Sequence, residues 1–251
     1  MASIKDISLI STRPEENNQK LAHALHDSNI EVLNFPLTKI EGLTNYTFLN
    51  EQLKDLNSYQ YLIFISTNAV RYFFEQIKVN KITLPKSLIL AAIGPTTKKD
   101  LQKFCGHQIY CPNDTFDSET LVRLEIFKNI SQKRILIIRG INGRETLKTI
   151  LEAKGAIVSY AECYQRLHLN LNFDAIFKKL ISPHKIYFLI SSHESAKQFK
   201  KQALLHKPTW LLSCKCFVNH NRIREEIQPL FSEVIILKDI SPESLRNNLL
   251  S

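Results

Sequence analysis

The chain has 251 residues, of which 44% are hydrophobic and 23% are charged, and its formal net charge is +9. This composition excludes a disordered chain, and no apolar run reaches the roughly 18–20 residues that a membrane-spanning helix needs. The N-terminal stretch carries Asp6 and lacks an apolar run of signal-peptide length, so we expect a cytoplasmic protein.

Short apolar runs alternate with helix-like stretches along the chain, which is typical of β-α units and a parallel sheet. In the first unit, a strand through Ile10 leads to Pro14, which suits the first turn of a helix. In the next, the run 61–65 is followed by Ser66, Thr67 and Asn68, which are all favourable helix N-caps.

Three further runs continue the same pattern. The run 88–93 leads through Gly94 into a helix, and the run 135–138 leads through the polar turn 139–144 into a helix that Gly155 closes. The runs 186–190 and 234–237 predict two more strands.

Four blocks of this pattern recur in the same order at nearly constant spacing, which indicates an internal duplication of one domain and not a solenoid. Polar loops follow the carboxyl ends of the predicted strands, where parallel sheets bind ligands and helix N-termini present free N–H groups. We therefore expect two rims that form an anion-binding cleft. The matched positions are Arg13 and Arg139 (offset 126), Ser66 and Ser191 (125), Gly94 and Cys216 (122), and Leu121 and Leu245 (124).

The five cysteines and eight histidines follow no metal-ligand spacing, so we expect reduced thiols, no metal and no cofactor. Basic residues come in pairs at most, for example Lys98 and Lys99. The net charge therefore has two interpretations, a solvated basic surface or a site for an anionic ligand.

The ordered segments STRPEE, YQYLIFISTNAVRYFF, AAIGPTTKKDLQK, ILIIRGINGRETL and GAIVSYAECYQR resemble the uroporphyrinogen-III synthase family. The resemblance covers most of the chain and implies a bilobed α/β fold with an open cleft. Two flavodoxin-like parallel-sheet domains would be joined by a two-stranded β-ladder linker. Residues 1–36 plus 167–251 would form the first domain and residues 37–166 the second, whereas the repeat alone also allows a single cut near residue 126.

The resemblance also implies a reaction in haem and sirohaem biosynthesis, catalysed by a hydro-lyase. The substrate would be hydroxymethylbilane, a linear tetrapyrrole whose pyrroles each bear an acetate and a propionate. The enzyme would close the ring with loss of water and invert the last pyrrole, whereas unassisted closure gives the uninverted isomer. Such a protein has to fold a flexible polyanion and direct the attack.

The resemblance gives expectations for partners as well. We expect a monomer that binds the polyanionic tetrapyrrole, that meets the preceding bilane-forming enzyme transiently, and that uses neither nucleic acid nor a membrane. The alternative is a basic two-lobed anion-binding or sensor module, for nucleic acid or a tetrapyrrole, without catalysis.

Tyr164, in AECYQR, matches the tyrosine that the family places near the hinge, and the resemblance assigns it to protonating the departing hydroxyl. The alternative is a tyrosine packed at a domain edge. The other matched residues have structural alternatives too, as plain helix caps or as arginines paired with a neighbouring helix. The implied substrate-binding residues are Arg13, Ser66, Thr67, Asn68, Gly94, Thr96, Thr97, Arg139, Gly140, Ser191, Ser192, His193 and Ser213.

Overall fold

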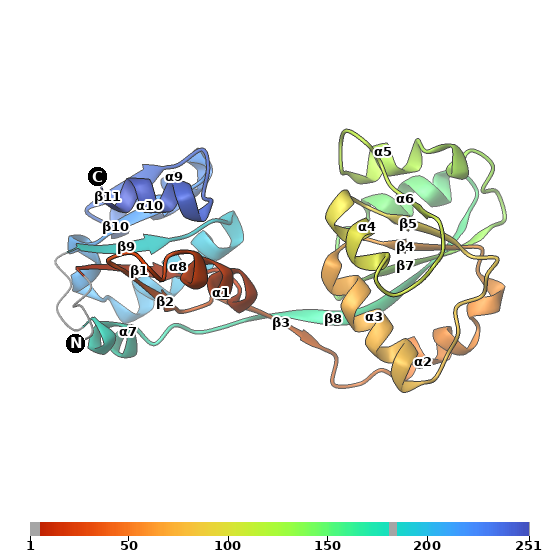
Figure 1. Ribbon diagram of the computed structural model, residues 1–251, viewed down its shortest axis with the longest axis horizontal. Helices are drawn as coiled ribbons and strands as arrows, with labels where there is room; N and C mark the ends of the chain where they lie inside the picture. Colours follow the sequence, from red (N-terminus) through yellow and green to blue (C-terminus); the bar gives the residue numbers. More distant parts are fainter. Residues whose placement is uncertain (1–5, 181–184, 251) are drawn as a thin grey trace. The chain divides into compact units, whose positions relative to one another are not determined.

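The computed structural model describes residues 6–180 and 185–250. The chain divides into two compact units, Met1–Lys39 with Leu167–Ser251 and Ile40–Arg166 (Figure 1). Each unit contains a sheet built mainly from parallel strands and covered by helices, which confirms the predicted α/β class. Within the described ranges, no helix has both the length and the apolar character to cross a membrane.

The first unit contains a five-stranded sheet in the order β11-β10-β9-β1-β2. The pairs β1–β2, β1–β9, β9–β10 and β10–β11 are all parallel. The strands are β1 (Ile7–Ser11), β2 (Ile30–Asn34), β9 (Lys185–Leu189), β10 (Lys215–Val218) and β11 (Glu233–Ile236).

Alternating side chains of this sheet enter two separate hydrophobic cores. Leu9 and its register partner Tyr187 lie in the core under α1 and α10, whereas Ile10 and Phe188 lie in the core under α7, α8 and α9. The helices are α1 (Glu15–Ala24), α7 (Phe173–Lys179), α8 (His193–His206), α9 (Asn221–Ile227) and α10 (Pro242–Leu250), with the 3₁₀ turns η3 (Thr209–Ser213) and η4 (Gln228–Leu230).

The second unit contains a six-stranded sheet in the order β3-β8-β7-β4-β5-β6. The pairs β4–β5, β4–β7, β5–β6 and β7–β8 are parallel. The strands are β3 (Thr38–Gly42), β4 (Tyr61–Phe64), β5 (Ile89–Ala92), β6 (Ile109–Tyr110), β7 (Arg134–Gly140) and β8 (Ile157–His168).

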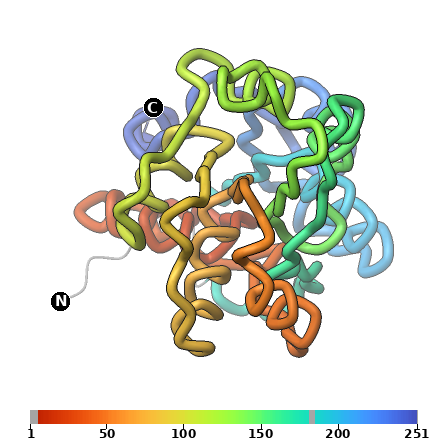
Figure 2. The backbone as a smooth tube through the Cα atoms, turned by 90° about the vertical axis from the view of Figure 1, so that its right-hand side faces the viewer, coloured from red at the N-terminus to blue at the C-terminus, as the bar shows by residue number. Residues whose placement is uncertain are grey.

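The same alternation divides the second unit into two cores. Leu62 and Phe64 face the core under α2, α3 and α4, whereas Tyr61 and Ile63 face the core under α5 and α6. Helix α3 packs beside α4 and α5 beside α6 (Figure 1, Figure 2). The helices are α2 (Thr47–Lys54), α3 (Thr67–Val79), α4 (Pro95–Leu101), α5 (Ser118–Val122) and α6 (Thr146–Ala153), with the 3₁₀ turns η1 (Leu56–Ser58) and η2 (Glu125–Phe127).

Candidate functional site

Three neighbouring strands of the second unit's sheet end at one edge, and the fourth strand beside them, β8, passes the same edge at Tyr164. Ser66 follows β4, Gly94 follows β5, Gly140 ends β7, and Tyr164 of β8 lies opposite Gly140 in the β7–β8 register. Because parallel strands point the same way, these positions converge at the edge where open α/β sheets bind ligands. Expected site residues from four neighbouring strands are thus brought to one edge.

Tyr164 makes specific contacts at this edge. Its hydroxyl oxygen Oη lies 3.1 Å from Oγ of Ser66. Its ring stacks on the Tyr72 ring, with 5.9 Å between the centroids and 23° between the planes. The side chain is half-buried, so the phenol combines a packed ring with a hydroxyl near the N-terminus of α3.

Ser66 is the N-cap of α3, as its sequence context predicts. Its backbone is extended, and its Oγ accepts a hydrogen bond from the Ala69 N–H at 3.0 Å. Thr67 and Asn68 form the first turn of this 13-residue helix and are half-buried. The positive end of the helix dipole therefore lies beside the Tyr164 hydroxyl.

The loop after β5 offers one exposed hydroxyl. Gly94 is the N-cap of α4, and a β-carbon there would lie 3.4 Å from Cβ of Phe116, so Phe116 covers this glycine. Thr96 is exposed, whereas Thr97 is only 5% exposed. Of the two threonines expected to bind substrate, only Thr96 is open to solvent.

Arg139 is buried and engaged within its own loop. Its Nε donates to the Gly140 carbonyl oxygen at 3.2 Å, and its Nη2 donates to that of Gly143 at 3.0 Å. Its Nη1 lies 3.0 Å from the Glu145 carboxylate, and its Nε lies 3.4 Å from that of Glu162. These contacts favour the alternative stated for Arg139, in which it pairs with a neighbouring helix, because Glu145 is the N-cap of α6.

Arg139 and Glu145 share a network with Tyr160. The Tyr160 hydroxyl donates to the Glu145 carboxylate at 2.7 Å. Burial, and after it the hydrogen bond to Glu145, raises the pKa of Tyr160. The hydrogen bonds from Tyr160 and from Arg139 lower the pKa of Glu145. This network holds the turn between β7 and α6 in place.

The first unit presents a similar edge at the ends of β1 and β9. Ser192 is the N-cap of α8, and its Oγ accepts from the Ser195 N–H at 3.1 Å. Ser191 and His193 flank it and are half-buried, and Nε2 of His193 lies 3.5 Å from the Glu226 carboxylate. Arg13 follows β1, and burial lowers its pKa.

Ser213 requires a correction, because it does not lie at this edge. It ends the turn η3 before β10 begins, so it lies at the amino edge of the parallel sheet, and its Oγ donates to the Trp210 carbonyl. Cys216 lies inside β10, whereas its matched residue Gly94 is a helix N-cap. The match is therefore out of step by four residues, the distance from Cys216 to the N-cap after β10. The residue that caps the helix after β10 is His220, whose Nδ1 accepts from the Arg222 N–H. In the sequence, the polar residues that follow the apolar strand in VNHN, residues 218–221, could have indicated this helix cap.

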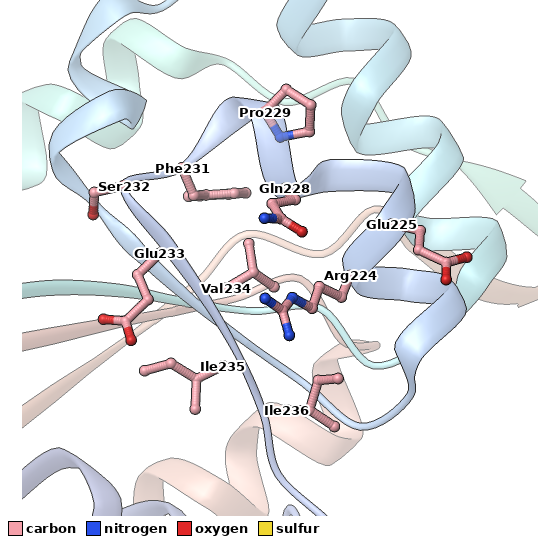
Figure 3. Close-up of a pocket in the computed structure, with 10 residues that line it drawn as sticks. All are labelled: Arg224, Glu225, Gln228, Pro229, Phe231, Ser232, Glu233, Val234, Ile235 and Ile236. Atoms are coloured by element: carbon pink, nitrogen blue, oxygen red, sulfur yellow. The ribbon is translucent and has the colours of Figure 1, made fainter.

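Each unit also carries a hollow in its surface. A broad one of about 1000 Å³ runs along the edge strand β11 and contains none of the expected site residues, and Arg224, Glu225 and Glu233 give it mixed charge (Figure 3). A smaller one of about 330 Å³ lies at the carboxyl edge of the second unit and is lined by Arg139 and Tyr160 among others.

Within the described parts of the chain, no three His, Cys, Asp or Glu side chains gather as a metal site requires.

Comparison with known proteins identifies the family. The family model described as uroporphyrinogen-III synthase HemD matches residues 19–245. The chain is 34% identical to uroporphyrinogen-III synthase of Proteus mirabilis over 164 residues, covering 65% of this chain and 82% of that one. It is 29% identical to the Escherichia coli enzyme over 218 residues, covering 86% and 89%.

Solved structures share the fold. A mutant uroporphyrinogen III synthase from the thermophilic bacterium Thermus thermophilus matches with a TM-score of 0.58 at 12% identity, covering 96% of this chain and 97% of that one. Uroporphyrinogen-III synthetase from Helicobacter pylori matches with a TM-score of 0.57 at 18% identity, covering 97% and 98%. With the family model extending over most of the sequence, this chain belongs to the uroporphyrinogen-III synthase family.

Proposed function

We propose that this chain closes hydroxymethylbilane to uroporphyrinogen III with loss of water, acting as a hydro-lyase in tetrapyrrole biosynthesis. Family membership supports the reaction, and it disfavours a sensor or nucleic-acid module. The observation that carries the mechanism is the Tyr164 hydroxyl, which lies 3.1 Å from Ser66 Oγ at the carboxyl edge of the second sheet.

Tyr164 acts as the general acid. The hydroxymethyl C–O bond breaks as the pyrrole nitrogen pushes in its electron pair, and the departing hydroxide takes the phenol proton and leaves as water. The azafulvene that remains is attacked by the substituted α-carbon of the last pyrrole, which gives a spirocyclic intermediate. The bond from that carbon to its original methylene bridge then breaks, and the bridge carbon, now part of a second azafulvene, bonds to the other α-carbon of the same pyrrole, which inverts this ring. The proton released on closure returns to the phenolate, so the enzyme is regenerated. General acid assistance is typically about 10²–10⁴-fold.

The acetate and propionate groups bind at the strand-end loops. Backbone N–H groups at the N-termini of α3 and α8 are suited to carboxylates, because they carry the positive ends of their helix dipoles. Thr96 and Arg13 contribute polar side chains to the same edges of their units. The net charge of +9 also attracts such a polyanion to the protein as a whole.

The test is a coupled assay that supplies fresh bilane and measures both turnover and the isomer formed. We expect Tyr164→Phe to lower turnover about 100-fold, near the low end of acid catalysis, because pyrrole nitrogen already helps to expel the hydroxyl. The product made on the variant should still be the inverted isomer. Tyr61→Phe is the control, because its hydroxyl donates to the Ile126 carbonyl in the opposite core.

Two outcomes would contradict this proposal. Turnover of Tyr164→Phe at the wild-type rate would remove the acid from the mechanism. Formation of only the uninverted isomer by the wild-type chain would remove the assigned reaction itself.

We also infer that the two units descend from one duplicated domain. The sheet orders β2-β1-β9-β10-β11 and β8-β7-β4-β5-β6 correspond strand by strand, which supports this origin. The caps Ser66 and Ser192, like Gly94 and His220, are 126 positions apart. Both chain crossings fall within β3 and β8, which are neighbours in one sheet, and we assign the two-stranded ladder to this pair.

A further inference from the structure

A β-bulge decides which core Tyr164 faces. The β7–β8 register pairs Arg139 with Glu162 but Gly140 with Tyr164, so β8 holds one extra residue, Cys163. Cys163 and Tyr164 both pack against the core under α3, although neighbouring residues of a strand normally point to opposite faces. Regular alternation would have put Tyr164 on the face of Tyr160. The bulge therefore turns Tyr164 toward α3.

Gly140 makes room for the Tyr164 ring in this orientation. A β-carbon at position 140 would lie 2.5 Å from Cε2 and 2.7 Å from Cζ of Tyr164. These distances are far below van der Waals contact, so any side chain here would displace the ring and its hydroxyl. Gly140 does not have a positive φ, so the close ring, and not the backbone conformation, calls for glycine.

Tyr72 and Ser66 limit the remaining motion of the ring. The Tyr72 ring stacks on Tyr164, and the Tyr72 hydroxyl donates to the Ile40 carbonyl at 3.3 Å, which anchors the stacking partner. Ser66 Oγ already accepts from the Ala69 N–H, and it meets the Tyr164 hydroxyl from a fixed helix cap. Tyr72 thus contacts the face of the Tyr164 ring, Gly140 lies at its edge, and Ser66 contacts its hydroxyl oxygen.

We propose that Gly140, Tyr72 and Ser66 are positioning residues that aim the Tyr164 hydroxyl at the departing group of the substrate. This inference rests on the proposed function, in which Tyr164 supplies the proton. It gives Gly140 a role other than the substrate binding expected from the sequence, because the Tyr164 ring occupies the space over its Cα.

The first experiment compares Gly140→Ala with Gly106→Ala, each in the wild-type and the Tyr164→Phe background. Gly106 is a matched control, because a β-carbon there meets nothing within 4 Å. We expect Gly140→Ala to lower kcat about 10- to 100-fold with KM changed less than about twofold, since the lost interaction acts in the transition state. In the Tyr164→Phe background, Gly140→Ala should lower kcat by less than about threefold, because the proton donor is already absent.

The second experiment keeps the proposal testable if Gly140→Ala does not fold. Tyr72→Phe preserves the stacked ring and should retain kcat within about threefold, whereas Tyr72→Leu should lower kcat about tenfold. Ser66→Ala should lower kcat about threefold to tenfold, as expected for one hydrogen bond. Circular dichroism and thermal melting would establish that each variant is folded.

The possible results separate the two proposals. If Tyr164→Phe is impaired while Gly140→Ala and Tyr72→Leu turn over at the wild-type rate, positioning is wrong and the acid stands. If Gly140→Ala lowers kcat as much in the Tyr164→Phe background as in the wild type, the decrease is structural. The positioning proposal is then also wrong. If Tyr164→Phe itself has full turnover, the proposed acid fails first.

Discussion

The guanidinium of Arg139 lies over the Tyr160 ring, 3.8 Å from its centroid. Arg139 is only 3% exposed, and its N–H groups donate to the carbonyl oxygens of Gly140, Gly143 and Arg144. A cation–π contact of this kind is strongest where water is excluded. The loop after β7 is therefore organised around this side chain, and its stability should depend on Arg139 more than catalysis does.

Replacing Arg139 with methionine should destabilise the fold. Methionine keeps much of the buried volume but leaves the loop carbonyls without their donor, so we expect a loss of about 2–4 kcal/mol in the free energy of unfolding. Urea denaturation would measure it. Arg144→Met is the control, because Arg144 is exposed and its change should stay within about 0.5 kcal/mol. An equally stable Arg139→Met variant would contradict the structural role.

Tyr160 should make stability depend on alkaline pH. Its pKa is raised in the folded protein, so above the ordinary value of about 10 the folded state keeps a proton that the unfolded state has lost. The contribution of the phenol is complete below pH 10 and declines as the pH rises above it. We expect the stability difference between wild type and Tyr160→Phe to be constant from pH 7 to 9 and to shrink above about pH 10. A difference that grows with pH would show that the assigned direction is wrong.

Ser192 and Ser191 should differ in their effects on stability. Ser192 Oγ accepts from the Ser195 N–H, so Ser192→Ala removes a helix cap and should cost about 1 kcal/mol. Ser192→Gly should recover most of this loss, because glycine is tolerated at an N-cap. Ser191 precedes the cap, and Ser191→Ala should stay within about 0.5 kcal/mol in thermal or urea unfolding. Equal losses at the two serines would contradict the assigned cap.

The two threonines of the α4 loop should separate binding from packing. Thr96 is exposed, so Thr96→Ala should raise KM about threefold to tenfold with kcat unchanged, if its hydroxyl binds a substrate carboxylate. Thr97 is buried, and Thr97→Val, which keeps its shape, should leave KM within about twofold. Steady-state kinetics of the two variants would decide, and a larger KM effect at Thr97 would reverse the assignment.

Local patterns in the sequence were sufficient for the strand–loop–helix units. Ser66 is an N-cap, and Gly155 closes α6 with a φ of 83°, both at the positions that the residue types predict. Such features depend on hydrogen bonds and backbone preferences within three or four residues, so neighbours along the chain determine them. The parallel α/β class follows from the same alternation of apolar and cap-rich stretches.

The tertiary structure alone decided where several of the candidate side chains point. Arg139 is engaged by Glu162 and Tyr160, which come from the neighbouring strand, and the bulge at Cys163 turns Tyr164 toward Ser66. Ser213 lies at the amino edge of its sheet because η3 ends before β10 begins. By itself, the sequence determined the local units and, through its ordered motifs, the family. Strand register, bulges and the choice of core that a strand side chain faces depend on pairing between segments far apart in sequence. No local pattern encodes that pairing.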